Sequence, residues 1–220
     1  MKLLPYFDAE RIEVGLDEVG RGCLAGPVFA AAVILSKDFD NDMLTDSKLV
    51  SEKNRDKLRQ VIENQALAWA VASADAREID EHNIANASYI AMHRALGMLT
   101  IQAELLLVDG KFFKPFENKT PYKCIIKGDS KYAPIAAASI LAKTYRDDYM
   151  KKLAPQYPHY FWDINKGYPT KQHRDGIAKY GDCEHHRQSF RLLADAPALI
   201  VSKPKSKPKS KPKSEPKLEE

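Results

Sequence analysis

Four acidic residues stand where an apolar segment of the chain meets a glycine. Asp17 and Glu18 follow IEVGL and precede GRG. Asp109 ends LLLV, and Asp129 follows CIIKG. Carboxylate oxygens are hard ligands that Mg²⁺ and Mn²⁺ prefer, and two such ions about 4 Å apart can stabilise the attacking and leaving oxygens in phosphodiester hydrolysis. The set predicts a metal centre of this kind, although Asp109 or Asp129 alone would be typical of an ordinary turn or helix cap.

The placement of these carboxylates depends on strand geometry. Strand ends gather at one edge of an α/β sheet, so the acidic residues can meet there. Adjacent residues of a regular strand point to opposite faces, so Asp17 and Glu18 share a site only if the strand curls or bulges. Gly20 and Gly22 permit such a distortion, and we expect one here.

Two nearby segments could contact a polyanion. The triplet Gly20-Arg21-Gly22 offers unobstructed backbone N–H groups and a guanidinium, which suits close approach to a sugar-phosphate backbone, although turns often use such triplets. Lys48 precedes the start of an expected helix, a common position for phosphate binding, although a solvated lysine is the commoner outcome.

Four further residues are candidates for substrate contact. Lys143 and Arg146 lie three residues apart on an Ala-rich helix and share one of its faces. Tyr168 lies between a glycine and a proline in a loop, where an exposed ring can stack on a sugar or base, or anchor the loop if it is buried. His173 could assist proton transfer or cap a helix.

The hydrophobic pattern predicts alternating strands and helices. Strands are expected at 12–19, 28–35, 67–73, 104–108 and 124–127, and helices at 52–65, 79–99, 133–150 and 171–180. Ser51 is a plausible N-cap and Pro134 lies in the first turn of its helix. The short link between the first two strands predicts that they are antiparallel. This alternation predicts a layered α/β fold.

Composition limits the class of protein. The 220 residues, 44% of them hydrophobic, are enough for one domain of ordinary size. No apolar run approaches the roughly 20 residues that span a bilayer, and charged residues near the N-terminus argue against a secretion signal, so we expect a cytoplasmic protein with no membrane partner. Three separated cysteines fit a reducing compartment.

The charge is unevenly distributed along the chain. The last 18 residues, KPKSKPKSKPKSEPKLEE, carry seven Lys and three Glu, while residues 1–202 hold 27 basic and 27 acidic residues. We therefore expect a domain over 1–202 without a global basic field and a disordered Lys/Pro/Ser-rich tail over 203–220. The tail is either a solubilising extension or a salt-sensitive phosphate tether.

The motifs together resemble those of bacterial ribonuclease HII. The matching stretches are GLDEVGRGCLAGPV, DSKLVSEKNR, IDEHNIANAS, LLLVDG, KGDSKYAPIAAASILAKTYRD, GYPTKQH and HRQSF. They occur in the family's order across most of residues 12–190, and DEVGRG with AAASILAK downstream is a highly specific combination. The resemblance implies a ribonuclease H-like fold, with a central mixed five-stranded sheet flanked by helices and a C-terminal helical part.

The resemblance also implies an activity and its residues. It implies an endonuclease that cuts the RNA strand of RNA–DNA hybrids and cuts 5′ to ribonucleotides embedded in duplex DNA, as in ribonucleotide excision repair, leaving a 3′-hydroxyl and a 5′-phosphate. The catalytic metal ligands for Mn²⁺ or Mg²⁺ are then Asp17, Glu18, Asp109 and Asp129. The segment Gly20, Arg21 and Gly22 reads the 2′-OH, and Tyr168 stacks on the deoxyribose after the ribonucleotide.

Two departures from the family pattern and several alternatives accompany this assignment. The KPKS tail has no counterpart, and DSKLVS replaces the usual DSKKLS, which removes a basic residue after Lys48. Only about 11 residues precede the first expected strand, which disfavours the related ribonuclease HIII with its extra N-terminal domain. A junction resolvase-like nuclease and a non-catalytic nucleic-acid-binding module are the alternatives. We expect a monomer, and a replication clamp is a possible partner.

Overall fold

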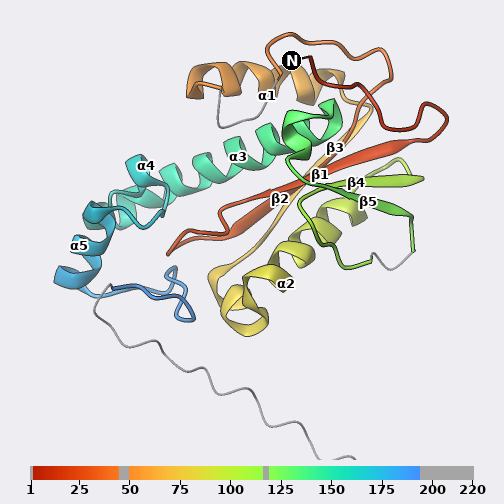
Figure 1. The fold of residues 1–220 in the computed structure, drawn as a ribbon. Helices are drawn as coiled ribbons and strands as arrows, with labels where there is room; N and C mark the ends of the chain where they lie inside the picture. Colours follow the sequence, from red (N-terminus) through yellow and green to blue (C-terminus); the bar gives the residue numbers. More distant parts are fainter. Residues whose placement is uncertain (1, 45–49, 116–118, 194–220) are drawn as a thin grey trace, which may run out of the picture.

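A mixed five-stranded sheet forms the centre of the protein. The computed structural model describes residues 2–44, 50–115 and 119–193 (Figure 1). The strands are β1 (Glu13–Val19), β2 (Val28–Ile34), β3 (Ala68–Ala74), β4 (Leu105–Asp109) and β5 (Tyr122–Ile125), in the spatial order β3-β2-β1-β4-β5. β1 is antiparallel to β2 and parallel to β4, β2 and β3 are antiparallel, and β4 and β5 are parallel. The predicted mixed α/β sheet is confirmed.

Helices cover both faces of the sheet. Helix α2 (Ala76–Gly97) lies on one face, and α1 (Glu52–Gln65) and α3 (Ala133–Leu153) lie on the other (Figure 1). Alternate strand residues divide between the two layers, as the period of two requires. Leu16 and Ala30 pack in the α2 layer, whereas Ala31 and Val33 pack in the α3 layer.

Helix α3 approaches β1 unusually closely because Gly15 has no side chain. A Cβ at Gly15 would lie 2.1 Å from the carbonyl carbon of Pro134, a distance that real Cβ atoms do not adopt. Pro134 lies in the first turn of α3, as expected, because this position does not need a backbone N–H. The contact holds the start of α3 against the middle of the strand that carries Asp17.

A smaller helical part follows α3. It contains α4 (Trp162–Asn165) and α5 (Lys171–Tyr180), which extend beyond the sheet (Figure 1). Its core holds Tyr160 and Trp162, both almost fully buried. The segment after α5 returns to the loop between β1 and β2 through a bridge between Ala25 and His186. This return connects the C-terminal part to the residues that follow Asp17 and Glu18.

Some expected boundaries differ from the structure. Helix α2 begins three residues early because Asp75 forms a capping box with Glu78, and it is kinked at Asn83, where φ is 64°. Strand β5 ends at Ile125 rather than at 127 because Lys127 adopts a left-handed conformation (φ 54°) before a 3-10 helix. Helix α4 was not predicted. Lys48 and the tail over 203–220 lie outside the described residues.

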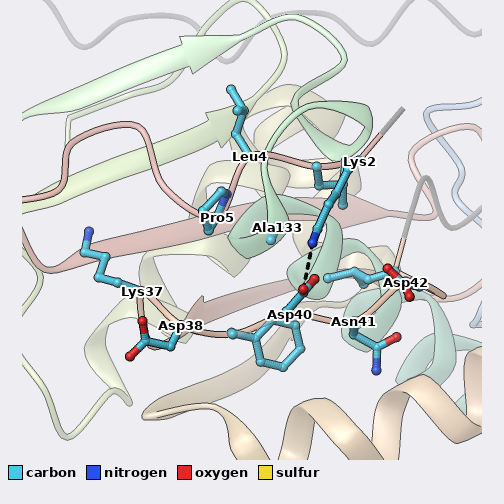
Figure 2. Close-up of a pocket in the computed structure, with 12 residues that line it drawn as sticks. Lys2, Leu4, Pro5, Lys37, Asp38, Asp40, Asn41, Asp42 and Ala133 are labelled. Carbon is cyan, nitrogen blue, oxygen red and sulfur yellow. Dashed lines mark hydrogen bonds and ion pairs between the residues drawn. The ribbon is translucent and has the colours of Figure 1, made fainter.

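A cavity of about 800 Å³ lies beside the N-terminal segment (Figure 2). Lys2 forms an ion pair with Asp40 there at 2.7 Å, and both side chains are exposed. Among the described residues, none that the sequence predicted as catalytic, metal-binding or substrate-binding lines this cavity. Within the described part of the chain, no helix is both long and apolar enough to cross a membrane.

Candidate active site

Asp17 and Asp109 are brought together by the register of β1 and β4. The parallel ladder ends at the pair Leu16–Val108, so Asp17 and Asp109 are the next residues on adjacent strands. Alternation directs both toward α3, since Leu16 and Val108 pack in the opposite layer. Asp17 is buried and its carboxylate accepts a hydrogen bond from the Ser139 hydroxyl of α3. The predicted meeting of acidic residues at strand ends is present for this pair.

Glu18 reaches the same region without the expected bulge. The β1–β2 register continues to the pair Val19–Phe29 with no inserted residue, so the expectation of a bulge is wrong for this ladder. Regular alternation starts Glu18 on the α2 face, and its Oε1 accepts from Nη1 of Arg21 at 2.8 Å. Its longer side chain still interacts electrostatically with Asp109. Glu18 lies beyond the last β1–β4 pair, and from there its side chain interacts with Asp109 without a bulge in β1.

The three carboxylates destabilise one another's charge. Burial, followed by repulsion from Glu18 and Asp109, raises the pKa of Asp17 well above its usual value. Burial also raises the pKa of Glu18, and Arg21 opposes this shift. A divalent cation would favour the ionised forms, so the donor chemistry fits Mg²⁺ or Mn²⁺.

The carboxylates of Asp17 and Asp109 accept hydrogen bonds from backbone N–H groups of the protein. The backbone N–H of Glu18 donates to Asp17 Oδ1 at 2.8 Å, and that of Gly128 donates to Asp109 Oδ1 at 2.7 Å. Within the described ranges, no three His, Cys, Asp or Glu side chains are grouped so as to hold one metal ion. Glu18 is engaged with Arg21 in this arrangement.

Asp129 lies close to the same strand end. It belongs to the 3-10 helix Gly128–Ser130 and is 3% exposed. Gly128 packs tightly there, since an added Cβ would lie 2.6 Å from Ile135 and 3.4 Å from Asp109 Oδ1. The contact between Gly128 and Asp109 therefore makes Asp129 a neighbour of the carboxylate cluster.

The loop after β1 carries the Gly20-Arg21-Gly22 triplet. Gly20 has φ 93°, and a Cβ there would lie 2.1 Å from Nε of Arg146, so only glycine is accommodated. Arg21 and Gly22 are exposed, and nothing lies within 4 Å of a Cβ added at Gly22. Of the predicted triplet, Arg21 and Gly22 are accessible near Glu18, whereas Gly20 is buried.

Arg146 does not occupy the expected position for a phosphate contact. Its side chain is fully buried, and its guanidinium donates to the carbonyls of Pro27 (3.0 Å), Ala25 (3.2 Å) and Lys166 (2.8 Å). A direct contact with substrate is therefore wrong for this residue. Its role is to tie the β1–β2 loop to the segment that leads to Tyr168.

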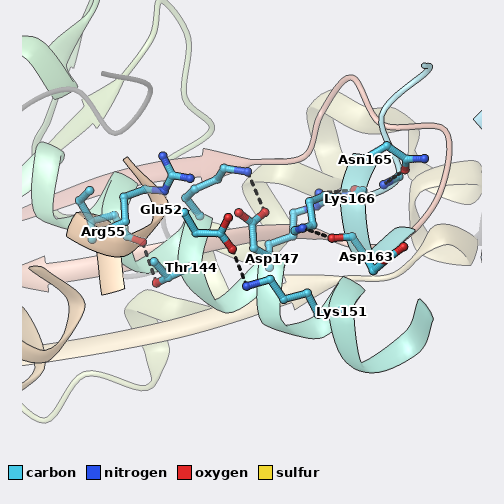
Figure 3. A network of polar contacts seen from close by, with 12 residues as sticks. Glu52, Arg55, Thr144, Asp147, Lys151, Asp163, Asn165 and Lys166 are labelled. Atoms are coloured by element: carbon cyan, nitrogen blue, oxygen red, sulfur yellow. Dashed lines mark hydrogen bonds and ion pairs between the residues drawn. The ribbon is translucent and has the colours of Figure 1, made fainter. Parts of the chain in front are cut away.

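Lys143 is partly exposed on the same helix. Its Nζ lies 2.7 Å from Asp147 Oδ1, and its side chain retains 22% exposure. The polar network along α3 continues with Lys151, which pairs with Glu52 of α1 at 2.6 Å (Figure 3). Lys143 could therefore contact a phosphate, but Asp147 already neutralises part of its charge.

Tyr168 lies beside the Gly20-Arg21-Gly22 loop. Burial, followed by interaction with the buried Cys23, raises the pKa of its hydroxyl. The ring lies 5.8 Å from the guanidinium of Arg146 and 6.0 Å from Nζ of Lys143. The residue remains 37% exposed, so it combines the two expected roles of loop anchor and accessible ring.

His173 positions Tyr168 instead of facing a substrate, because it is fully buried. Cys183 N donates to His186 Nδ1 at 3.0 Å, which puts the His186 proton on Nε2, the atom 3.1 Å from His173 Nε2. His173 Nε2 also accepts from Trp162 at 3.0 Å, so its Nδ1 carries the proton and donates to the Tyr168 carbonyl at 2.9 Å. Its burial and these hydrogen bonds argue against the proton-transfer alternative for His173, and the N-cap of α5 is Thr170, so His173 does not cap the helix either.

Sequence reasoning assigned no role to three residues that support the site. Ser139 interacts with Asp17, Cys23 interacts with Tyr168, and Arg187 donates hydrogen bonds to the loop after β1. The only signal for Ser139 was a hydroxyl within an otherwise apolar helical run, AAASIL. Arg187 lies in HRQSF, and its guanidinium donates to Gly20, Arg21 and Gly26, which are distant along the chain and leave no local pattern.

Comparison with known proteins identifies the family. Residues 14–193 match the family model described as Ribonuclease HII. The chain belongs to the ribonuclease HII family. It is 57% identical over 193 residues to a ribonuclease HII of Bacteroides thetaiotaomicron, covering 88% of this chain and 96% of the relative. A ribonuclease HII of Parabacteroides distasonis is 58% identical with the same coverage. This ribonuclease HII is therefore a ribonuclease H endonuclease, which sets aside the non-catalytic alternative.

Solved structures agree with the fold of this ribonuclease HII. The ribonuclease H2 of Pyrococcus horikoshii matches with a TM-score of 0.70 and 24% identity, covering 82% of this chain and 94% of that one. A PCNA:RNase HII complex from Archaeoglobus fulgidus matches with a TM-score of 0.65 and 26% identity over 84% and 98%. Bst-RNase HIII in complex with Mn²⁺ matches with a TM-score of 0.60 and 16% identity over 77% and 63%. The ribonuclease H-like fold is confirmed.

The buried histidine pair predicts a pH-dependent stability. Burial lowers the pKa of His186 to about 4, against an unfolded value of 6.5, so the folded state binds fewer protons than the unfolded chain below pH 6.5. The stabilisation is present above 6.5 and is lost as the pH falls toward 4. Relative to His186→Gln, we expect the unaltered protein to lose more Tm between pH 7 and pH 5. Equal slopes by differential scanning fluorimetry would contradict the assignment.

For Asp17 we expect the opposite pH dependence of stability, which the substitution Asp17→Asn tests. A raised carboxyl pKa contributes stability that is lost as the pH rises through the folded value, and Asn cannot ionise. In EDTA at pH 8 we expect a higher Tm for the variant, with a smaller gain at pH 5. Adding Mg²⁺ should raise the Tm of the unaltered protein more than that of the variant. Asp40→Asn, at an exposed ion pair, is the control and should change neither property.

Proposed function

We propose that this ribonuclease HII cuts 5′ to ribonucleotides embedded in duplex DNA as well as the RNA strand of RNA–DNA hybrids. The observation that supports this most directly is the hydrogen bond from the Leu24 N–H to the Gly167 carbonyl at 2.8 Å, which holds the partly exposed Tyr168 next to the Gly20-Arg21-Gly22 loop. The same loop begins two residues after Glu18, so a ribose bound at it would lie near the carboxylates.

The carboxylate cluster is the proposed site of two divalent ions, Mn²⁺ or Mg²⁺. Asp17 and Asp109 would hold the ions, with Glu18 and Asp129 completing the ligand set. When bound, the ions supply an activated water for in-line attack on phosphorus and neutralise the developing charge. The mutual repulsion of Asp17, Glu18 and Asp109 supports this assignment, because a cation removes it.

Substrate positioning is proposed for the loop and for Tyr168. The N–H groups of the Gly20-Arg21-Gly22 segment would recognise the ribose 2′-OH, the group that distinguishes RNA from DNA. Tyr168 would stack on the deoxyribose that follows the ribonucleotide. Lys143, 6.0 Å from that ring, is suited to neutralise a neighbouring phosphate, and Lys48 keeps the same predicted role.

The products and the setting follow from this chemistry. Attack on the phosphate 5′ to the ribonucleotide would leave a 3′-hydroxyl and a 5′-phosphate on a ribonucleotide-ended strand. Such a nick is the entry point for ribonucleotide excision repair in the cytoplasm. A replication clamp is a possible partner, because one solved relative is a PCNA:RNase HII complex, and the monomeric state stays a prediction.

Asp17→Asn and Asp109→Asn test the metal-ligand assignment. Loss of one transition-state contact commonly costs on the order of 10²–10³ in rate, and we expect at least that loss in Mg²⁺ for each variant. Affinity for a duplex with one ribonucleotide should be largely retained, as measured by fluorescence anisotropy. Asp40→Asn is the matched control. Near-normal cleavage by either site variant would contradict the assignment.

Tyr168→Ala tests the recognition of the ribonucleotide junction. Stacking is worth about 1–3 kcal/mol, so we expect cleavage of a single embedded ribonucleotide to fall about tenfold more than cleavage of a long hybrid. Tyr168→Phe keeps the ring and loses only the hydroxyl, so it should retain most of the preference. Equal losses on both substrates for Tyr168→Ala would rule out the junction role.

A further inference from the structure

Arg187 contacts the loop after β1 from its buried side. Its side chain is fully buried. Nη2 donates to the carbonyl of Gly20 at 2.7 Å, and Nη1 donates to that of Arg21 at 2.9 Å. Nε and Nη2 both donate to the carbonyl of Gly26, at 3.0 and 2.8 Å. One guanidinium therefore holds both ends of the loop.

The segment around Arg187 is itself firmly docked. The N–H of Arg187 donates to the Leu24 carbonyl at 2.9 Å, and Gly26 N–H donates to the His185 carbonyl at 2.9 Å. On the other side, the Asp80 carboxylate of α2 accepts the N–H groups of Gln188 and Ser189, both at 2.9 Å. The guanidinium thus has a fixed position relative to the sheet.

Planar trans peptides convert these contacts into an orientation of N–H groups. In a trans peptide the C=O of one residue and the N–H of the next point in opposite directions, and the described residues contain no cis peptide. Since the carbonyls of Gly20 and Arg21 point inward to Arg187, the N–H groups of Arg21 and Gly22 point outward. Both residues are exposed, and no acceptor in the described part of the chain takes either N–H.

We infer that Arg187 is the positioning residue for ribose recognition, because it aims the N–H groups of Arg21 and Gly22 at the oxygen of the ribose 2′-OH. This inference rests on the proposed function, in which the loop reads that hydroxyl. Two adjacent N–H groups form a concave site for an electron-rich oxygen. A charged donor on each carbonyl also polarises the peptide and strengthens its N–H as a donor.

Arginine is required for this arrangement, and lysine does not replace it. The planar guanidinium presents several N–H groups in a fixed fork, so it reaches three carbonyls at once. A lysine ammonium keeps the charge but not the fork, so one or more of the loop peptides would be released. The released peptide could rotate and turn its N–H away from the substrate.

The test compares affinities for two duplexes that differ in one hydroxyl. Fluorescence anisotropy, with Ca²⁺ in place of Mg²⁺ and cleavage checked on gels, gives the affinity for a DNA duplex with one ribonucleotide and for the all-DNA duplex. Arg187→Lys should reduce the preference for the ribonucleotide about tenfold, which corresponds to a loss of about 1.4 kcal/mol. Affinity for the all-DNA duplex should change little.

Arg174→Lys is the matched control. Arg174 donates to the carbonyls of Arg191, at 3.2 Å, and Leu192, so it anchors the same C-terminal segment without contacting the loop. The control should keep the full preference. An unchanged preference in Arg187→Lys, or an equal loss in both variants, would overturn the inference. If the unaltered protein itself shows no preference, the proposed function fails instead.

A second measurement needs no variant, in case Arg187→Lys does not fold. Amide hydrogen exchange of the unaltered protein, resolved at Arg21 and Gly22, is compared with each duplex bound. We expect the ribonucleotide duplex to protect both amides and the all-DNA duplex to leave them exchanging. Equal protection by the two duplexes would overturn the inference.

Discussion

Asp17 and Asp109 lie side by side because β1 and β4 are parallel and in register up to the pair Leu16–Val108. A register shift of one residue would turn one carboxylate to the opposite face, where α2 packs. The close approach of α3 at Gly15 places this helix against the carboxylate pair and brings Ser139 to Asp17. Every other feature of the site is arranged around this pair of strand ends.

Buried cations and neutral imidazoles support the loops that face the substrate. Arg146 and Arg187 donate to carbonyls of the β1–β2 loop, and His173 donates to the carbonyl of Tyr168. Burying a guanidinium is costly unless its N–H groups find acceptors. Each arginine therefore needs several loop carbonyls around it, and this requirement fixes the shape of the loop. The carboxylate cluster lies beside this support and is itself electrostatically strained, a condition that a divalent cation relieves.

Much of the fold could be predicted from the sequence because its signals are local. The Ala-rich run with Pro134 predicted α3, and the apolar run at 28–34 predicted a buried strand. Strand ends with glycine predicted the positions of the carboxylates. The roles of Arg146 and His173 could not be predicted, because Arg146 is buried by contacts with the distant β1–β2 loop and His173 by tertiary packing against Trp162 and His186. A basic residue next to a motif gives the same sequence signal whether it faces a phosphate or a carbonyl.

The central claim is that the carboxylate pair, the loop and Tyr168 act together on a phosphodiester beside a 2′-OH. The most direct measurement incubates the protein with duplex DNA containing one ribonucleotide, in Mg²⁺, Mn²⁺ or EDTA, and maps the cut at nucleotide resolution. The account predicts a single metal-dependent cut 5′ to the ribonucleotide, leaving a 3′-hydroxyl, with the all-DNA duplex intact. Cleavage at another position, cleavage in EDTA, or equal cleavage of the all-DNA duplex would contradict it.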